Sequence, residues 1–148
     1  VAVLRSANMS IGINVILKLL KEAVSRFAPE GFDVEIVEKH HNQKLDAPSG
    51  TAIALADAMN EEMNGMYEYV YDRSQVRKKR GKKELGISAI RGGNIVGEHD
   101  VIFAGTDEVI TISHSAHSKA IFAKGAIAAA KYLAGRTPGL YDMSDVMA

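Results

Sequence analysis

Cysteine is absent from this chain of 148 residues, which excludes a disulfide framework and any metal site built on thiolates. Neither sign of charge is in excess, since lysine plus arginine and aspartate plus glutamate number 18 each. The net charge therefore gives no reason to expect nucleic acid or an anionic membrane as a partner. No apolar run approaches the roughly 20 residues of a membrane span, and no basic and then apolar leader opens the chain. We expect a soluble, cytoplasmic protein.

The length is sufficient for one domain with a hydrophobic core and too short for two ordinary domains. The chain opens on the apolar run Val1 to Leu4 rather than on methionine, and we expect it to be a piece of a longer protein. No G-x-G-x-x-G pattern follows a predicted strand anywhere in the sequence. A dinucleotide-binding half is therefore not expected within these residues.

Three segments have the apolar spacing of amphipathic helices. The first extends from Ser10 to Pro29, and the second follows Ser49, a residue typical of a helix N-cap. The third extends over about 119–135, where many alanines and Gly125 allow close packing on a sheet. These helices supply apolar faces that a sheet can bury.

Alternating apolar residues at 32–36 predict a strand that leads to His40. Three further short strands are expected near 85–91, 95–104 and 108–115. Because only short turns separate these three strands, we expect them to be antiparallel neighbours. Residues 67–84 have no sustained period and are predicted to form a long loop.

The order of these elements predicts an α+β fold, with one mixed sheet of about four strands and helices packed mainly on one face. The other face then needs a partner, and we expect an apolar surface that is covered by assembly into a homotetramer. The residues assigned to this open face are Val101, Phe103, Ile110 and Ile112.

Residues 38–51, which read EKHHNQKLDAPSGT and are called the histidine segment below, join the first strand to the second helix. A helix N-terminus presents backbone N–H groups without intrahelical partners and a partial positive charge. Gly50 allows an anion to approach those donors closely. The step Ser49-Gly50-Thr51 is therefore a candidate cradle for a carboxylate or a phosphate.

Lys44 and the imidazoles of His40 and His41 lie in the same segment. Lysine adds a full cation, and histidine titrates near neutral pH and can exchange protons. Each part has a simpler interpretation: Ser-Gly-Thr can be only a helix cap, a surface lysine is usually solvated, and one histidine can pack while the other is exposed. Their coincidence favours an enzyme site that binds an anion and transfers a proton.

Three other features are weaker candidates. His99, His114 and His117 could bind a metal ion, but no carboxylate falls at ligand spacing beside them, and we expect no metal site. The basic run RKKRGKK at 77–83 could hold phosphate or nucleic acid, yet it lacks interleaved aromatic residues and is typical of a solvated loop. Arg91 ends a predicted strand and could reach either a ligand or a salt bridge.

The string HHNQKLDAPSGTA closely resembles the signature of the dihydrodipicolinate reductase family. The likeness covers essentially the whole chain, through the stretches SANMSIGINVILKLL, VEIVEKHHNQKLDAPSGTA, RGGNIVGEHDVIFAG and GLYDMSDV. In that family an N-terminal Rossmann domain binds NADH or NADPH, and a C-terminal domain binds the substrate and builds a tetramer through its sheet. The resemblance implies that residues 1–148 are this second domain, without the nucleotide-binding domain.

The resemblance also implies roles for particular segments. Residues 1–9 would be the interdomain hinge, and residues 139–148 a tail that packs on the nucleotide-binding domain. His40 would donate and accept the proton, and Lys44 would donate a proton and hold a substrate carboxylate. The implied substrate-binding residues are His41, Lys44, Ser49, Gly50 and Thr51. The implied cofactor contacts are Ser6, Ala7, Asn8 and Met9.

The implied reaction is NAD(P)H-dependent reduction of 4-hydroxy-tetrahydrodipicolinate to tetrahydrodipicolinate, in lysine and diaminopimelate biosynthesis. The substrate is a small dicarboxylate, and this chain by itself is expected to be inactive. Two rival interpretations stay open from the residues alone. A non-catalytic oligomerisation module would need the sheet but not His40 or Lys44, and a metal-dependent hydrolase would need a bound ion.

Overall fold

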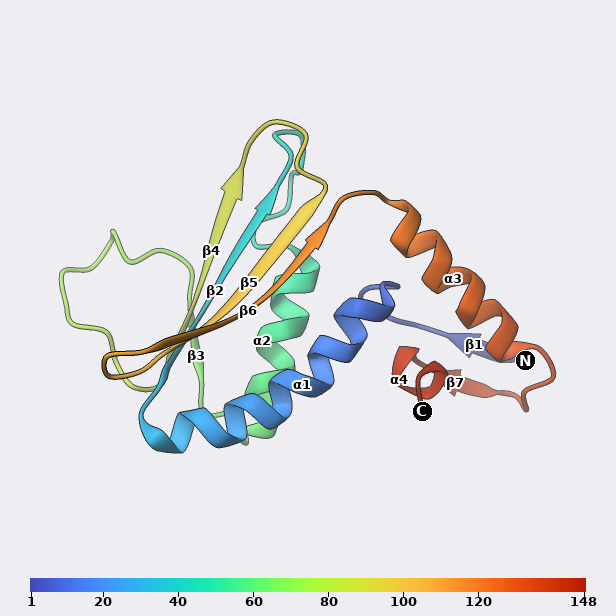
Figure 1. The fold of residues 1–148 in the computed structure, drawn as a ribbon, viewed down its shortest axis with the longest axis horizontal. Coiled ribbons are helices and arrows are strands. Elements are labelled where there is room, and N and C mark those ends of the chain that lie inside the picture. Colours follow the sequence, from blue (N-terminus) through green and yellow to red (C-terminus); the bar gives the residue numbers. More distant parts are fainter.

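The computed structural model describes residues 1–148. In chain order its elements are β1 (Ala2–Leu4), α1 (Ile11–Phe27), the 3-10 turn η1 (Ala28–Glu30), β2 (Asp33–His40), α2 (Gly50–Glu62), β3 (Glu68–Val70), β4 (Glu84–Arg91), β5 (Gly97–Ala104), β6 (Val109–Ala116), α3 (Ala120–Leu133), β7 (Gly139–Tyr141) and α4 (Met143–Val146). Figure 1 shows the larger sheet with α1 and α2 beside it, and α3 with the short terminal elements at the other end of the molecule.

The main sheet has five strands in the order β3-β4-β2-β5-β6. Strand β2 is parallel to β4 and antiparallel to β5, and β5 is antiparallel to β6. The predicted α+β class and mixed sheet are therefore confirmed. Residues 68–70, which were predicted to lie in a long loop, instead form the edge strand β3.

The predicted neighbours β4 and β5 are not adjacent, because β2 lies between them. Their connection at 92–96 crosses the end of β2, and two backbone hydrogen bonds tie it there: Gly92 N to His40 O at 3.0 Å, and Asn42 N to Gly93 O at 3.1 Å. A few extended residues are long enough to pass one strand at a spacing of about 4.8 Å. The short connection between β4 and β5 therefore does not require these two strands to be neighbours in the sheet.

Helices α1 and α2 cover one face of the main sheet and bury the core against it. The core residues are Leu20, Val24, Val34, Ile36, Ala52, Leu55, Ala56, Met59, Tyr67, Leu85, Ile87, Val101 and Phe103. Ser49 is the N-cap of α2, as predicted, because its Oγ accepts a hydrogen bond from Ala52 N at 3.1 Å. The structure adds a second cap, since Ser10 Oγ accepts a hydrogen bond from Ile13 N at 3.3 Å at the start of α1. Both caps fix where the helices start relative to the sheet.

The assignment of four apolar residues to the open face was wrong. Val101 and Phe103 are 1% and 0% exposed in the helix-covered core, and Ile110 and Ile112 pack against the same core. In the register of β5 with β6, Val101 lies opposite Ile112 and Phe103 lies opposite Ile110, so these four side chains point to the same face of the sheet. A register shifted by one residue would have placed them on the other face.

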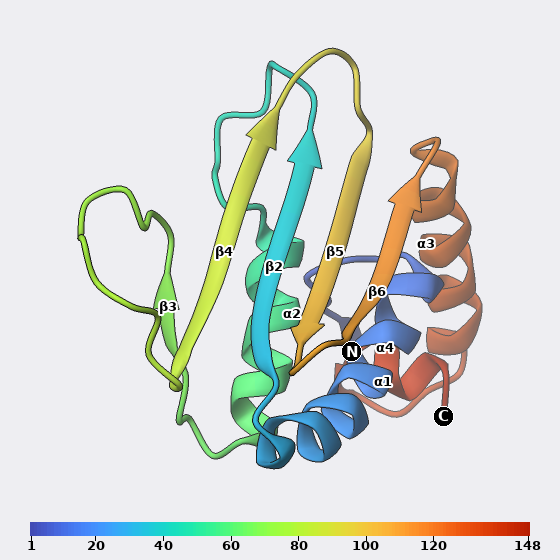
Figure 2. The same cartoon turned by 60° about the vertical axis from the view of Figure 1, so that its left-hand side comes forward.

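The opposite surface, called the outer face below, is covered by no helix (Figure 2). Alternation along the strands places there Val37 and Ile102, together with the ion pairs from Lys39 to Glu98 at 3.3 Å and to Asp100 at 3.8 Å. The outer face is thus mixed in polarity rather than uniformly apolar.

A second, parallel sheet joins the two ends of the chain, with β1 paired to β7. Helix α3 packs beside β1 and α4. A Cβ atom added at Gly125 would lie only 1.6 Å from Met9 O, so this glycine permits a close approach to the segment before α1. This close contact is with residues 1–9, which are predicted to be the interdomain hinge and are called the hinge segment below, while α3 packs beside β1, a strand of the second sheet. No helix is both long enough and apolar enough to cross a membrane.

Candidate functional site

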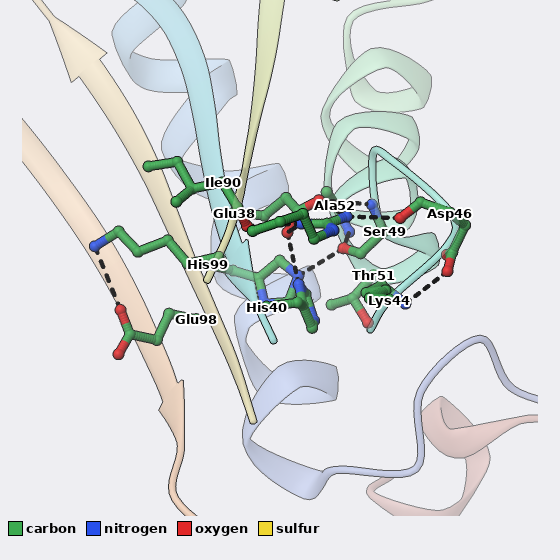
Figure 3. Close-up of polar contacts among 12 residues, drawn as sticks. Glu38, His40, Lys44, Asp46, Ser49, Thr51, Ala52, Ile90, Glu98 and His99 are labelled. Carbon is green, nitrogen blue, oxygen red and sulfur yellow. Dashed lines mark hydrogen bonds and ion pairs between the residues drawn. The ribbon is translucent and has the colours of Figure 1, made fainter. Parts of the chain in front are cut away.

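Glu38, the first residue of the histidine segment, has a fully buried carboxylate that lies beside His40 and Ser49 (Figure 3). Strand alternation turns Glu38 to the helix-covered face, in line with Val34 and Ile36. Its Oε1 accepts hydrogen bonds from Arg91 Nη2 at 2.8 Å and from Ser49 N at 3.0 Å. Its Oε2 accepts from Arg91 Nη1 at 2.8 Å and pairs with His40 Nδ1 at 2.6 Å.

This arrangement keeps Glu38 ionised. Burial by itself raises the pKa of the carboxyl group, but hydrogen bonds from Arg91, His40 and the Ser49 amide outweigh it and hold the pKa below its usual value. Since an ionised carboxylate only accepts hydrogen bonds, His40 must donate from Nδ1. The Nε2 atom is then the nitrogen of His40 that is left for proton exchange with a ligand.

Ser49 connects this carboxylate to the start of α2. Its amide binds Glu38, and its hydroxyl both caps α2 and lies 2.8 Å from His99 Nε2. Burial, with a smaller contribution from the charge on His40, lowers the pKa of His99 from 6.5 to about 4. His99 is therefore neutral at neutral pH and can accept the Ser49 hydroxyl proton.

The helix start beyond Ser49 is open. No atom lies within 4 Å of a Cβ built at Gly50, so a ligand can approach the backbone there. Thr51 follows, and its hydroxyl accepts a hydrogen bond from Asn8 Nδ2 at 2.8 Å. The segment predicted to be the cradle is thus an accessible helix N-terminus, held in place by Ser49 on one side and by the hinge segment on the other.

Lys44 lies at the rim of the site, and the His41 ring accepts a hydrogen bond from Gln43 N at 3.3 Å within the same loop. Lys44 Nζ is 2.9 Å from Asp46 Oδ1, and the Lys44 side chain is 22% exposed. Arg91 Nη2 also donates to Asp46 O at 2.6 Å, which anchors the loop that carries Lys44. Lysine is therefore paired but reachable, so that a ligand carboxylate can compete with Asp46 for it.

The four predicted cofactor contacts do not share one cavity. Asn8 lines a cavity of about 40 Å³ together with His40, Thr51 and Gly97. Ser6 and Ala7 instead line a hollow of about 510 Å³ on the other side of the hinge segment, between α1, α2 and α4. Met9 contacts α3 through its carbonyl group.

The small cavity and the larger hollow differ in chemistry. The small one has room for a few water molecules only, so a ring ligand bound by the histidine segment must lie mainly outside it, over Gly50 and Lys44. The larger hollow contains none of the histidine-segment residues and mixes both signs of charge, with Lys18 and Lys21 near Asp57 and Glu61. The hinge segment separates the two.

The structure brings His40, Ser49 and Thr51 together and leaves Lys44 at the rim, while the His41 ring contacts only its own loop at Gln43 N. It also adds three residues that were not predicted to act here: Glu38, Arg91 and His99. Glu38 could have been noticed as a charged residue in an inward-facing strand position after Val34 and Ile36. Arg91 was predicted to reach either a ligand or a salt bridge, and in the structure it forms a salt bridge to Glu38.

The weaker candidates are also placed by the fold. His99 and His114 face each other across β5 and β6, while no group of three or more histidine, aspartate or glutamate side chains is arranged to hold a metal ion. Within the basic run, Arg80 binds Asp33 at 3.1 Å and Glu35 at 2.8 Å at the opposite end of the sheet from His40.

Together, the fold and the site define an α+β domain with an accessible helix N-terminus and a carboxylate-held imidazole beside it. The sequence profile described as "Dihydrodipicolinate reductase, C-terminus" matches residues 12–147. The chain belongs to the dihydrodipicolinate reductase family.

Curated relatives agree with this assignment. The 4-hydroxy-tetrahydrodipicolinate reductase of Caldanaerobacter subterraneus subsp. tengcongensis is 58% identical over 147 residues, which cover 99% of this chain and 58% of that protein. The enzyme of the same name from Methanosarcina mazei is 51% identical over 142 residues, covering 96% and 52%. The chain thus spans little more than half the length of these relatives.

The fold has a counterpart among solved structures, "Dipicolinate bound Dihydrodipicolinate reductase from Paenisporosarcina sp. TG-14". The match has a TM-score of 0.71 at 24% identity and covers 94% of this chain and 52% of that one. At this identity the likeness concerns the fold.

Proposed function

We propose that this chain is the substrate-binding and proton-supplying part of a cytoplasmic, NAD(P)H-dependent reductase that converts 4-hydroxy-tetrahydrodipicolinate to tetrahydrodipicolinate, in lysine and diaminopimelate biosynthesis. The observation that carries the proposal is the convergence of His40, the open start of α2 at Gly50 and the rim cation Lys44. The names of the relatives support the reaction, and the dipicolinate in the structural relative supports a ring dicarboxylate as ligand.

The proposed binding mode uses both carboxylates of the substrate. One accepts hydrogen bonds from the backbone N–H groups of Gly50 and Thr51, where the partial positive charge of the helix start adds to the attraction. The other pairs with Lys44, which exchanges Asp46 for the ligand, and His41 closes the rim. Two anchored carboxylates fix the ring in one orientation, and this lowers the entropic part of the barrier.

His40 would exchange the proton. Loss of water from the hydroxylated substrate leaves a conjugated cyclic imine, and addition of one hydride at ring C4 and one proton at the neighbouring carbon gives the product. With Nδ1–H held by Glu38, His40 would give the proton from Nε2 as the imidazolium and return to the neutral Nδ1–H form; Nε2 lies at the cavity edge near Gly97 and Thr51. Lys44 is assigned a second proton-donating role at the rim.

The hinge segment is the part of this chain that we assign to the nicotinamide. Ser6 Oγ donates to Asn8 O at 2.7 Å and Asn8 Nδ2 to Thr51 Oγ1 at 2.8 Å, so the segment has a fixed shape beside the cradle. Ser6, Ala7, Asn8 and Met9 would contact NADH or NADPH, whose nucleotide part is assigned to sequence outside this chain. When bound there, the cofactor supplies the hydride.

We also propose that the protein assembles as a homotetramer through the outer face of the sheet. This surface has no helix over it, and it combines Ile102 and Val37 with the Lys39–Glu98 pair. Assembly would bury the apolar residues while the polar ones set the register. Sedimentation should give four copies, and a monomer at micromolar concentration would contradict this part of the proposal.

The reaction is tested in the full-length reductase by following oxidation of NADPH with substrate. His40→Ala should lower kcat by about 10²-fold with little change in KM. Lys44→Ala should raise KM and lower kcat together, because charge and proton are both lost. The matched control is Lys82→Ala, an 82% exposed cation at the far end of β4, which should leave both constants unchanged. A His40→Ala enzyme that retains kcat would refute the assigned role.

Binding is tested separately in this chain by calorimetric titration with pyridine-2,6-dicarboxylate. We expect weak binding that Lys44→Ala reduces and Lys82→Ala preserves, and no turnover with NADPH. A bulky residue at Gly50 should block binding, because it would occupy the approach to the helix start. Wild-type affinity in both the Lys44 and Gly50 variants would favour the alternative of a non-catalytic oligomerisation module.

A further inference from the structure

The carboxylate of Glu38 is fully buried and has all of its acceptor positions occupied. Each oxygen accepts two hydrogen bonds, from Arg91 and Ser49 at Oε1 and from Arg91 and His40 at Oε2. An ionised carboxylate offers about four such positions. Glu38 therefore has no free lone pair for a ligand or for a transferred proton.

We propose that Glu38, locked by Arg91, is a positioning residue for the proposed reaction: it fixes His40 with its proton on Nδ1 and, through the Ser49 amide, holds the anion cradle in register with that imidazole. The inference rests on the proposed function for its chemistry. Its geometric content, the tautomer of His40 and the link to Ser49, is independent of that function.

The first argument concerns which nitrogen of His40 is available. Arg91 is always charged and keeps Glu38 ionised, so the Glu38 oxygen can only accept the hydrogen at His40 Nδ1. The opposite edge of the ring lies against Gly97, where an added Cβ would be 3.1 Å from Nε2, and both residues line the small cavity with Thr51. The protein thus directs one nitrogen inward to a fixed anion and the other to the site.

The second argument is that stability alone does not call for this pair. Replacing a buried ion pair by apolar residues of similar size is often neutral or stabilising. The preceding inward positions of the same strand, Val34 and Ile36, are apolar and fully packed. An apolar residue at position 38 would extend that core. Glu38, paired with Arg91, instead fixes the orientation of the His40 ring.

The third argument is that the same two residues hold the cradle. Ser49 N donates to Glu38, and Arg91 Nη2 donates to Asp46 O at 2.6 Å, so the loop before Gly50 is fixed at both ends. The imidazole proposed to transfer the proton and the helix start proposed to bind the anion are consequently both held by one carboxylate, that of Glu38. A shift of either by about 1 Å is enough to lower turnover strongly.

The geometric part is tested by 15N NMR of the imidazoles in this chain, at a pH where His40 is neutral. Wild type should show the Nδ1–H form of His40. In Glu38→Gln the amide NH2 group can donate to His40, and the Nε2–H form should dominate. Glu38→Asp retains the anion and should keep the Nδ1–H form. Glu22→Gln, which removes an exposed carboxylate on α1, is the matched control and should leave the spectrum unchanged.

The kinetic part uses the same variants in the full-length reductase. Glu38→Gln should lower kcat at least about 10²-fold, as expected for an imidazole in the wrong tautomer, with a much smaller change in KM. Glu38→Asp should recover part of kcat, and Glu22→Gln should equal wild type. A dominant Nε2–H form of His40 in wild type overturns the inference even if Glu38→Gln fails to fold, and so does full kcat in a folded Glu38→Gln enzyme. Absence of turnover in wild type would instead refute the proposed function, while the NMR result would still decide the tautomer.

Discussion

The two ends of the main sheet both carry arginine–carboxylate pairs, yet they use them differently. At the carboxyl ends of β2 and β4, Arg91 and Glu38 lie on the helix-covered face, where the Glu38 side chain is 0% exposed. At the opposite end, Arg80 pairs with Asp33 and Glu35, whose side chains are 34% and 27% exposed. Figure 2 shows both ends of these strands, with the histidine segment and the basic loop at opposite ends.

The difference teaches that burial, and not the pairing itself, decides what such a contact does. A charge that is out of contact with water depends on its partner and can orient a neighbouring group. A charge at the surface has water as an alternative partner, so its pairing mainly anchors a loop. The same residue types therefore orient the His40 ring at the site end and anchor the basic loop to the sheet at the other end.

The largest effect is expected from removing Arg91. Arg91→Met leaves the buried Glu38 without its counter-charge, and the free energy of unfolding should fall by about 3 to 5 kcal/mol. Urea unfolding at neutral pH measures this. A loss below about 1 kcal/mol would mean that Glu38 is not kept ionised by Arg91, and the contrast between the two ends would disappear.

The next effect is a dependence of stability on pH between about 6.5 and 4 that we expect mainly from the histidines at the site end. Folding lowers the pKa of His99 from 6.5 to about 4, so in this window the unfolded chain binds more protons than the folded one. Stability should then fall as the pH is lowered through the window, by about 3 kcal/mol in all. His114, whose pKa burial also lowers, acts in the same direction.

His99→Gln tests this assignment by urea unfolding at several pH values. Glutamine can still bind Ser49 but does not titrate, so most of the slope between pH 6.5 and 4 should be lost. Arg80→Ala is the matched comparison at the other end and should retain the wild-type slope. An unchanged slope in His99→Gln would place the pH dependence elsewhere.

A smaller loss of stability is expected from Arg80→Ala. Arg80 binds Val34 O at 2.9 Å and Glu84 O at 2.6 Å besides its carboxylates, so several hydrogen bonds are lost together. Water can reach the carboxylates left behind, and the expected cost is about 2 kcal/mol. A cost above that of Arg91→Met would reverse the ranking of the two ends.

The smallest effect is expected from Arg73→Ala. The Arg73 side chain is 42% exposed and contacts Glu35 and Glu84, and Arg80 and Lys78 remain to pair with these carboxylates. Glu84, whose side chain is 9% exposed, keeps Lys78 at 3.8 Å, so the free energy of unfolding in urea should fall by no more than about 1 kcal/mol. A larger fall would show that the loop at 71–83 supports the sheet, and hydrogen exchange of β3 would then identify where.

The sequence was most informative where structure is set by neighbours along the chain. Ser49 was predicted as a cap because a serine before a helical pattern can bind an amide three residues ahead, and the helix start at Gly50 followed from the same local rule. It was least informative about which strands pair. The short turn at 92–96 suggested adjacency of β4 and β5, and nothing local indicated that β2 lies between them.

By itself, the sequence determined the α+β class, the helix boundaries and the histidine segment with its cradle, because these depend on periodicity and on contacts within a few residues. The tertiary structure alone decided that Glu38, Arg91 and His99 meet beside His40, and that Val101 and Phe103 face the helices. Residues 38, 91 and 99 lie on three strands, and only the register of β2 with β4 and β5 brings their side chains together. Strand register depends on the packing of the whole face, so no short stretch of sequence determines it.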